Sequence, residues 1–131
     1  MILSRRAIGK AIKQGKVTVA PFYEDQIETA HINLHLDLPD KKTELIVPAK
    51  SFFIAQTFEK ITLADDICGF MEGKASLARQ GISVEQPSTF IEPGSDNHMT
   101  LEIFNASDQP VTLKTGQPIA KMFLVRVIDD V

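Results

Sequence analysis

The chain has 131 residues, of which 44% are hydrophobic, and its formal net charge is −3. This length predicts a single domain, residues 1–131, with enough apolar material for an ordinary core. The negative net charge argues against a broad basic surface and therefore against a nucleic-acid polymer as partner, although the few cations that a single nucleotide needs remain possible.

The cysteine content and the N-terminal segment bear on where the protein works. Cys68 is the one cysteine of the chain and lies in an apolar, strand-like run, so we expect a small core residue and no internal disulfide. The N-terminus carries cations without a long apolar run, so neither a signal peptide nor a membrane span is expected. The sequence therefore predicts a cytoplasmic protein.

The N-terminal segment predicts a short helix. Ser4 is a suitable N-cap, Ile8 and Ala11 share one face at helical spacing, and Gly15 ends the pattern shortly after Lys13. We therefore expect one helix before the first strand.

After this helix the pattern changes to short apolar runs separated by turn residues and prolines. Many short strands of this kind are typical of an antiparallel sandwich or barrel. A polar hairpin turn is predicted at Asp40-Lys41-Lys42 and one helical turn at 76–80. The predicted strands are 16–22, 30–38, 43–47, 52–58, 67–71, 82–85, 99–105, 111–113 and 118–127.

The strand predicted at 99–105 carries a candidate general base. Alternation puts Leu101 and Ile103 on one face of the strand and Glu102 on the other. Glu102 is an ordinary solvent-facing residue unless that face looks into a cleft or a subunit interface, where a half-buried carboxylate can take a proton from water. Glu92 has the same two interpretations, a surface acid beside a turn or a group that activates water.

The segment Gly73-Lys74-Ala75-Ser76-Leu77-Ala78-Arg79 has the composition of a phosphate-binding loop. Lys74 and Arg79 supply cations, Ser76 supplies a hydroxyl, and a helix N-terminus would add backbone N–H groups. The alternative is a solvated turn with a serine cap. Each signal is weak alone, and the hypothesis rests on the order of this segment with the two glutamates that follow it.

The histidines do not predict a metal site. His31 and His35 share a strand face but lie about 13 Å apart at the rise of a strand, and His98 is isolated. A zinc-dependent base deaminase needs His and Cys ligands, which one cysteine does not supply. Any deamination here must therefore be metal-free at the base, with a carboxylate activating water.

Taken together, these segments resemble the dCTP deaminase and dUTPase superfamily. Besides the loop and Thr100-Leu101-Glu102, the resemblance rests on Ala30-His31-Ile32-Asn33-Leu34-His35-Leu36, where the family usually has Tyr-Asp-Leu-Arg-Leu. Phe53-Ile54-Ala55-Gln56-Thr57-Phe58-Glu59 and Gly116-Gln117-Pro118-Ile119-Ala120-Lys121-Met122 match two further strands. The resemblance implies an all-β fold: a distorted, jelly-roll-like β-barrel with a short N-terminal helix and one helical turn. It also implies a homotrimer with active sites between subunits.

The resemblance implies metal-free deamination of dCTP, giving dUTP and ammonia. Glu102 matches the glutamate that takes a proton from the water attacking C4 of cytosine, and Arg79 matches the arginine that helps to hold this site. Lys74 and Ser76 match the phosphate-contacting loop. Glu92 matches the acid that activates water in dUTPases, where it is usually Asp. Mg²⁺ is implied as a companion of the deoxynucleotide triphosphate, and no zinc is expected.

Departures from the family pattern keep two alternatives open, a dUTP diphosphatase and a non-catalytic, trimeric nucleotide-binding or regulatory protein. At the substrate-binding positions, Ala75 stands where the deaminases usually carry a serine, and Ser88 stands where they have a small apolar residue near the base. Asn97 replaces a common glycine. The sequence ends at Val131, before the family's tail that closes over the triphosphate, so weaker triphosphate binding is expected.

Overall fold

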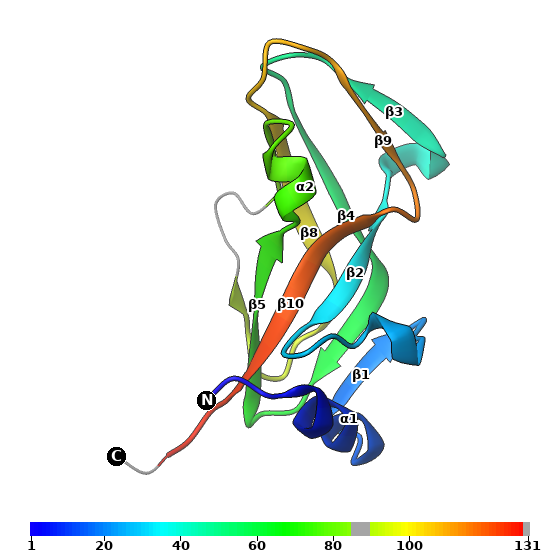
Figure 1. The fold of residues 1–131 in the computed structure, drawn as a ribbon. Helices are drawn as coiled ribbons and strands as arrows, with labels where there is room; N and C mark the ends of the chain where they lie inside the picture. Colours follow the sequence, from blue (N-terminus) through cyan, green and yellow to red (C-terminus); the bar gives the residue numbers. More distant parts are fainter. Residues whose placement is uncertain (85–89, 130–131) are drawn as a thin grey trace.

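The computed structural model describes residues 1–84 and 90–129, which form a curled half-barrel of antiparallel strands with helix α1 (Arg5–Lys13) at one end (Figure 1). This architecture confirms the predicted all-β, jelly-roll-like class. A second helix, α2 (Ala75–Ala78), is a single turn. In the described part of the chain, no helix has the length and apolar character of a membrane span.

The main sheet has the strand order β6-β8-β4-β2-β10-β5-β7, and β1 pairs with β4 beside this path. Strand β10 therefore lies between β2 and β5, although it follows both by many residues. Strands β3 and β9 form a separate two-stranded sheet. The strands are β1 (Val17–Ala20), β2 (Ile32–Asp37), β3 (Glu44–Val47), β4 (Phe52–Leu63), β5 (Ile67–Gly73), β6 (Ile82–Ser83), β7 (Phe90–Ile91), β8 (Asp96–Asn105), β9 (Val111–Lys114) and β10 (Pro118–Arg126).

Helix α1 forms as predicted. The Ser4 Oγ accepts a hydrogen bond from the Ala7 N–H at 3.2 Å, which caps the first turn. Ile8 and Ala11 are buried against the domain, and Gly15, just after the helix, adopts a positive φ of 74° that favours glycine.

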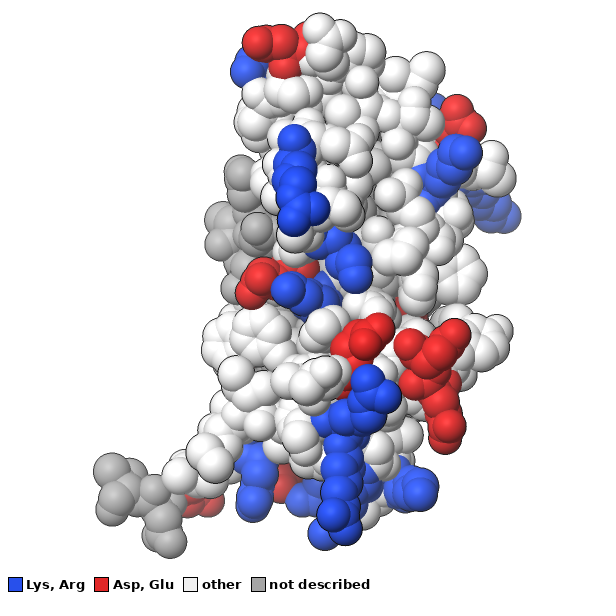
Figure 2. Space-filling view, viewed as in Figure 1, with Lys and Arg blue, Asp and Glu red and all other residues white. Residues whose placement is uncertain are grey.

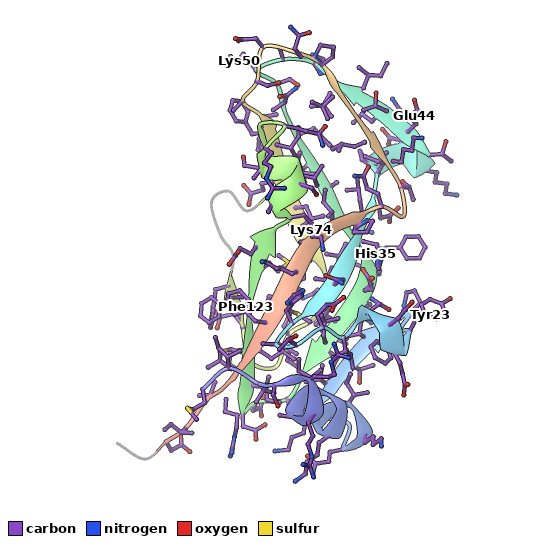
Figure 3. All side chains as sticks on the ribbon, in the orientation of Figure 1. Tyr23, His35, Glu44, Lys50, Lys74 and Phe123 are labelled. Carbon is purple, nitrogen blue, oxygen red and sulfur yellow. The ribbon has the colours of Figure 1, made fainter. Side chains whose placement is uncertain are left out.

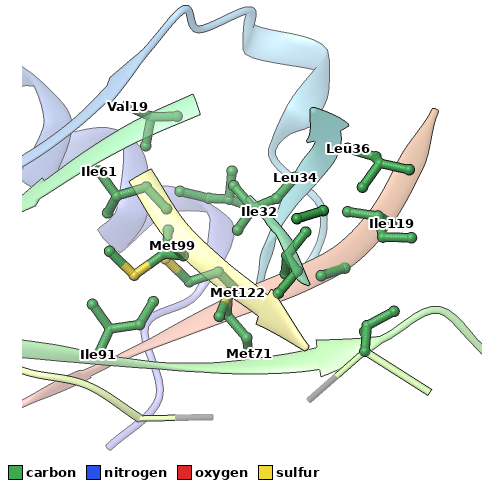
Figure 4. Close-up of a cluster of buried hydrophobic side chains, with 14 of the residues drawn as sticks. Val19, Ile32, Leu34, Leu36, Ile61, Met71, Ile91, Met99, Ile119 and Met122 are labelled. Carbon is green, nitrogen blue, oxygen red and sulfur yellow. The ribbon is translucent and has the colours of Figure 1, made fainter. Parts of the chain in front are cut away.

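The core lies on the inner face of the curled sheet (Figure 4). Alternation along β8 buries Met99, Leu101 and Ile103, as expected, and the same period buries Leu34 and Leu36 of β2. Cys68 is also buried, as predicted. The alternating residues of these strands point outward, and the candidate site is built from them.

Some local predictions differ from the structure. Strand β4, expected over 52–58, continues to Leu63. The segment around Asp40 is not a hairpin turn: Pro39–Lys41 is a 3₁₀ turn, η2, that leads the chain from β2 to β3, which pairs with β9 instead. The helical turn starts one residue earlier than predicted, at Ala75. Strand β7 was missed because its two paired residues are too short a run to show a period.

Asn105, at the end of β8, joins the main sheet to the loops around β3 and β9. Its side chain is buried, and its amide donates to the carbonyl oxygens of Val47, Pro48 and Gln109 at 3.1, 3.3 and 2.8 Å. Its Oδ1 accepts from the N–H and the hydroxyl of Ser107 at 3.0 and 2.8 Å.

We expect Asn105→Ala to lower the free energy of unfolding by about 3 kcal/mol, because several buried polar groups lose their partner together. Urea denaturation followed by circular dichroism measures the difference. Asn97→Ala, at an exposed position of the same strand, should change the value by less than about 0.5 kcal/mol. Equal effects of the two substitutions would contradict this role for Asn105.

Candidate active site

Glu102 lies on the outer face of β8, half-buried, opposite Ile54 of β4. Its neighbours on that face are apolar and exposed: Ile54 is 55% and Phe52 is 54% accessible. Among the described residues, the side chain of Glu102 makes no hydrogen bond or ion pair. Its carboxylate is therefore accessible beside an exposed apolar surface.

Arg79 precedes the short strand β6, which pairs with the end of β8. Arg79 is the exposed C-cap of α2, and β6 pairs with β8 so that Ser83 lies opposite Phe104, two residues from Glu102. The register carries the chain from Arg79 toward Glu102, but it leaves Arg79 beyond Asn105, at the far end of this pairing. Ser83 is a site neighbour that the sequence reasoning missed, because a two-residue strand gave no signal of its partner.

Lys74 lies at the other end of α2, between α2 and β10 (Figure 3). As the N-cap it makes no side-chain cap bond, and its Nζ instead donates to Asn33 Oδ1 of β2 at 3.2 Å. Asn33 in turn pairs across the sheet with Lys121 of β10. Lys74 therefore joins a group of polar residues on the outer face of β2 and β10, and the sequence had not indicated Asn33 or Lys121 as part of it.

His31 reports the electrostatics of this group. The pKa of His31 lies below its ordinary value of 6.5, chiefly because the side chain is partly buried. The positive charges of Lys121 and Lys74 act in the same direction and lower the pKa further, whereas a hydrogen bond with Asn33 raises it. An anion such as a phosphate is favoured there, and an additional proton is not.

Because the pKa of His31 is lower in the folded than in the unfolded state, its contribution to stability is fully present above about pH 6.5. The contribution is lost as the pH falls from there through the lower pKa of the folded state. We expect Lys121→Gln to raise the pKa of His31 toward 6.5, measured by NMR titration of the imidazole proton. Lys41→Gln, which removes an exposed cation of η2, should leave it unchanged. An unchanged pKa of His31 in Lys121→Gln would contradict the role of Lys121 in lowering it.

The remaining predicted residues are distributed as follows. Ala75 and Ser76 are both exposed in the first turn of α2, so Ser76 is accessible but does not cap the helix. Glu92 is exposed in the turn after β7, a strand that pairs with β5 at the opposite edge of the sheet from β6 and β8. The structure does not bring Glu92 next to Glu102 within one chain. Ser88 lies outside the described residues.

Two hollows flank these groups. A cleft of about 900 Å³ is lined by Asn33, His35 and the aromatic Phe22, Tyr23 and Phe58, and therefore begins at the partner of Lys74. A smaller hollow of about 460 Å³ is lined by Ile54, Gln56 and Thr100 on the face of Glu102. The larger hollow thus lies beside Asn33, the partner of Lys74, and Glu102 is not among its lining residues. Its size alone therefore does not identify it as the place of the reaction.

The wall of the larger cleft contains a buried carboxylate. Alternation along β4 places Glu59 on the buried face with Thr57 and Ile61, and Glu59 is 2% exposed. Its Oε1 accepts the backbone N–H of His35 at 2.9 Å, and its Oε2 accepts the side-chain amide of Gln26 at 2.9 Å and lies 2.6 Å from His35 Nδ1. Glu59 thus ties three segments together at the base of the cleft.

Within residues 1–84 and 90–129, no group of three or more His, Cys, Asp or Glu side chains could hold an ion. Mg²⁺ that arrives with a triphosphate needs only one or two carboxylates in addition to phosphate oxygens and water.

Comparison with solved structures shows that dCTP deaminases and dUTPases share the fold of this chain. A 2′-deoxycytidine 5′-triphosphate deaminase from Agrobacterium tumefaciens aligns with a TM-score of 0.77 and 18% identity, over 96% of this chain and 48% of that chain. The EIAV dUTPase aligns with a TM-score of 0.68 and 19% identity, over 88% of this chain and 92% of that one. The chain spans about half the length of the first of these two structures.

Sequence comparison then gives the family: the chain belongs to the dCTP deaminase-like family, whose model matches residues 37–127. A relative from Mycobacterium sp. (strain KMS), "dCTP deaminase, dUMP-forming", is 30% identical over 97% of this chain and 81% of its own length. A protein of the same name from Nocardia farcinica is 32% identical over 97% of this chain and 77% of its own length. These names specify dUMP, and not the dUTP expected from the sequence, as the product of the relatives.

Proposed function

We propose that this protein is a hydrolase that removes the amino group of dCTP, with Glu102 as the general base. The observation that carries the proposal is the position of Glu102: half-buried on an outer strand face, free of partners among the described residues, and beside exposed Ile54. An apolar surrounding disfavours the charged carboxylate and so makes it a better proton acceptor once substrate excludes water.

In the proposed reaction Glu102 takes a proton from water, and the oxygen bonds to C4 of cytosine. Glu102 passes that proton to N3 of the ring. The hydroxyl proton of the tetrahedral C4 is then transferred to the amino group, the C4=O bond forms, and ammonia leaves. Arg79 would hold the site, as the resemblance implies, and Lys74 and Ser76 would contact phosphate oxygens at the start of α2. Ala75 and Ser88 would line the nucleotide without supplying catalysis. Mg²⁺ would accompany the triphosphate as part of the substrate. The dUTPase from phage phi11, a neighbour in fold, coordinates a structural Mg(II) ion.

A homotrimer would complete the site. Lys74 and Glu102 lie at different places on the outer surface of one chain, since β8 is separated from β10 by two strands. The exposed apolar residues Phe52, Ile54 and Phe58 of β4 support a subunit contact on the face of Glu102. Light scattering after size-exclusion chromatography would show a trimer, and a monomer at assay concentration would contradict it.

A second candidate product is dUMP, which the names of the relatives favour. In that case a water activated by Glu92 would attack the α-phosphorus, and diphosphate would leave. Glu92 stands at the edge strand β7, so an interface that brings β7 of one chain to β8 of another would join the two carboxylates.

The experiment that tests both is incubation of the protein with dCTP and with dUTP in the presence of Mg²⁺, with dUTP, dUMP, ammonia and diphosphate resolved. Conversion of dCTP to dUTP supports deamination alone. Conversion to dUMP supports the two-step reaction. If both nucleotides are bound but unchanged, the protein is a nucleotide-binding member of the family, and the assignment of Glu102 as a base fails.

A further inference from the structure

The charges of this chain are strongly segregated. Residues 1–16 contain five of the 14 Lys and Arg residues and none of the 17 Asp and Glu residues. This segment therefore carries +5, while the rest of the chain, with nine cations and 17 acids, carries −8. Figure 2 shows Lys and Arg gathered at the α1 end of the molecule. The expectation that no nucleic-acid polymer binds rested on net charge, which hides this distribution.

Four cations of α1, namely Arg5, Arg6, Lys10 and Lys13, form what we call the basic face. Arg6, Lys10 and Lys13 are exposed at positions i, i+4 and i+7, so they follow one another at about 6 and 4.5 Å along the helix axis. Among the described residues these three make no ion pair or side-chain hydrogen bond. Arg5 has a weak partner in Glu28 at 3.8 Å, and Glu24 is the other acid at this face.

Gly9 lies in the middle of the basic face and is not explained by packing. Glycine in the interior of a helix is unfavourable relative to alanine. A Cβ at Gly9 would nevertheless meet no heavy atom within 4 Å. The residue lies in a hollow of about 510 Å³ that the four cations surround. Open space where a side chain would fit, ringed by cations, is what close approach of an anion to the helix backbone requires.

We propose that the basic face of α1 binds the phosphodiester backbone of a nucleic acid, without reading its base sequence, with a phosphate seated over Gly9. A row of cations a few ångströms apart fits the regular charge of such a backbone. An anionic membrane fits less well, because Ile8 and Ala11, the buried apolar residues of α1, pack into the domain and are unavailable for insertion. This proposal does not depend on the deaminase assignment.

The test is binding of short, fluorescein-labelled single-stranded and duplex DNA of mixed sequence, followed by anisotropy over a range of salt concentrations. Arg6→Gln/Lys10→Gln/Lys13→Gln should weaken binding at least tenfold. It should also reduce the slope of log K against log salt by about 2 for the single strand, since each phosphate contact contributes about 0.7. The matched control is Lys41→Gln/Lys42→Gln/Lys114→Gln, which removes the same charge from η2 and β9 and should bind like the parent protein.

Gly9→Ala distinguishes a phosphate bound over Gly9 from non-specific electrostatic attraction of DNA to the basic face. It should raise the melting temperature, because alanine favours the helix, and yet weaken DNA binding. The proposal is overturned if the parent protein binds neither DNA at low salt, or if the two triple variants lose affinity equally. It is also overturned if anionic vesicles are bound and DNA is not. Unchanged DNA affinity in Gly9→Ala would contradict the proposed phosphate position over Gly9.

Discussion

Replacing Glu102 by glutamine is expected to reduce ammonia release from dCTP by about 10²- to 10⁴-fold, the usual contribution of a positioned general base. Glutamine keeps the shape of the side chain but accepts no proton from water. The side chain of Glu102 makes no hydrogen bond or ion pair within the described residues that the substitution would break, so the free energy of unfolding should stay the same within about 0.5 kcal/mol. A coupled ammonia assay at saturating dCTP measures the effect on kcat.

The control for this substitution is Glu44→Gln, which changes an exposed glutamate of β3 on the separate sheet (Figure 3). It should leave both kcat and KM at the parent values. If Glu102→Gln retains more than a tenth of the parent kcat while its fold is intact, the base is another group. If the loss is in KM alone, Glu102 binds nucleotide without transferring a proton.

Replacing Glu59 by leucine should lower the free energy of unfolding by about 3–5 kcal/mol, the largest stability effect that we expect from a single polar residue. Its carboxylate is 2% exposed and accepts from both the backbone N–H of His35 and the side-chain amide of Gln26. Leucine fills a similar volume but leaves these donors buried without an acceptor. The midpoint of urea denaturation, with the slope checked for two-state behaviour, measures the loss.

Glu44→Leu provides the comparison, because it makes the same chemical change at an exposed strand position and should alter stability by less than about 1 kcal/mol. Gln26→Leu is a second probe of the network and should cost less than Glu59→Leu, since the His35 contacts remain. A loss below about 1 kcal/mol in Glu59→Leu would show that water reaches the freed donors through the cleft.

The elements that the sequence predicted well are those whose signal is local. The N-cap and apolar face of α1 fixed that helix, and period-two alternation along 99–105 separated the core face of β8 from Glu102. Family-like segments identified the fold class. Each of these signals is contained within a short stretch of the chain, so no knowledge of its neighbours is needed.

The relations that escaped prediction depend on which segments meet. Lys74 was expected to act with Ser76, yet its contact is Asn33, some forty residues upstream. The two meet because β5, which ends just before Lys74, pairs with β10, and β10 pairs with β2. The predicted strand ended at 58, so the sequence did not show that Glu59 alternates with Thr57 and Ile61 on the buried face of β4. The charge segregation at α1 was visible in the sequence but was lost in the net charge.

The position of β10 has a consequence for how the protein is made. Met122 of β10 pairs with Ile32 of β2, ninety positions earlier, and with Met71 of β5. Strand β10 therefore joins β2 to β5, which do not pair with each other directly. During synthesis, β2 and β5 are both complete long before the strand that joins them emerges. Until then both strands expose backbone amides and apolar faces, so the nascent chain depends on late closure, and contacts so distant in sequence form slowly. Chaperone demand should therefore be greatest just before residues 118–126 leave the ribosome, and a chain ending before Pro118 should fail to accumulate as soluble protein.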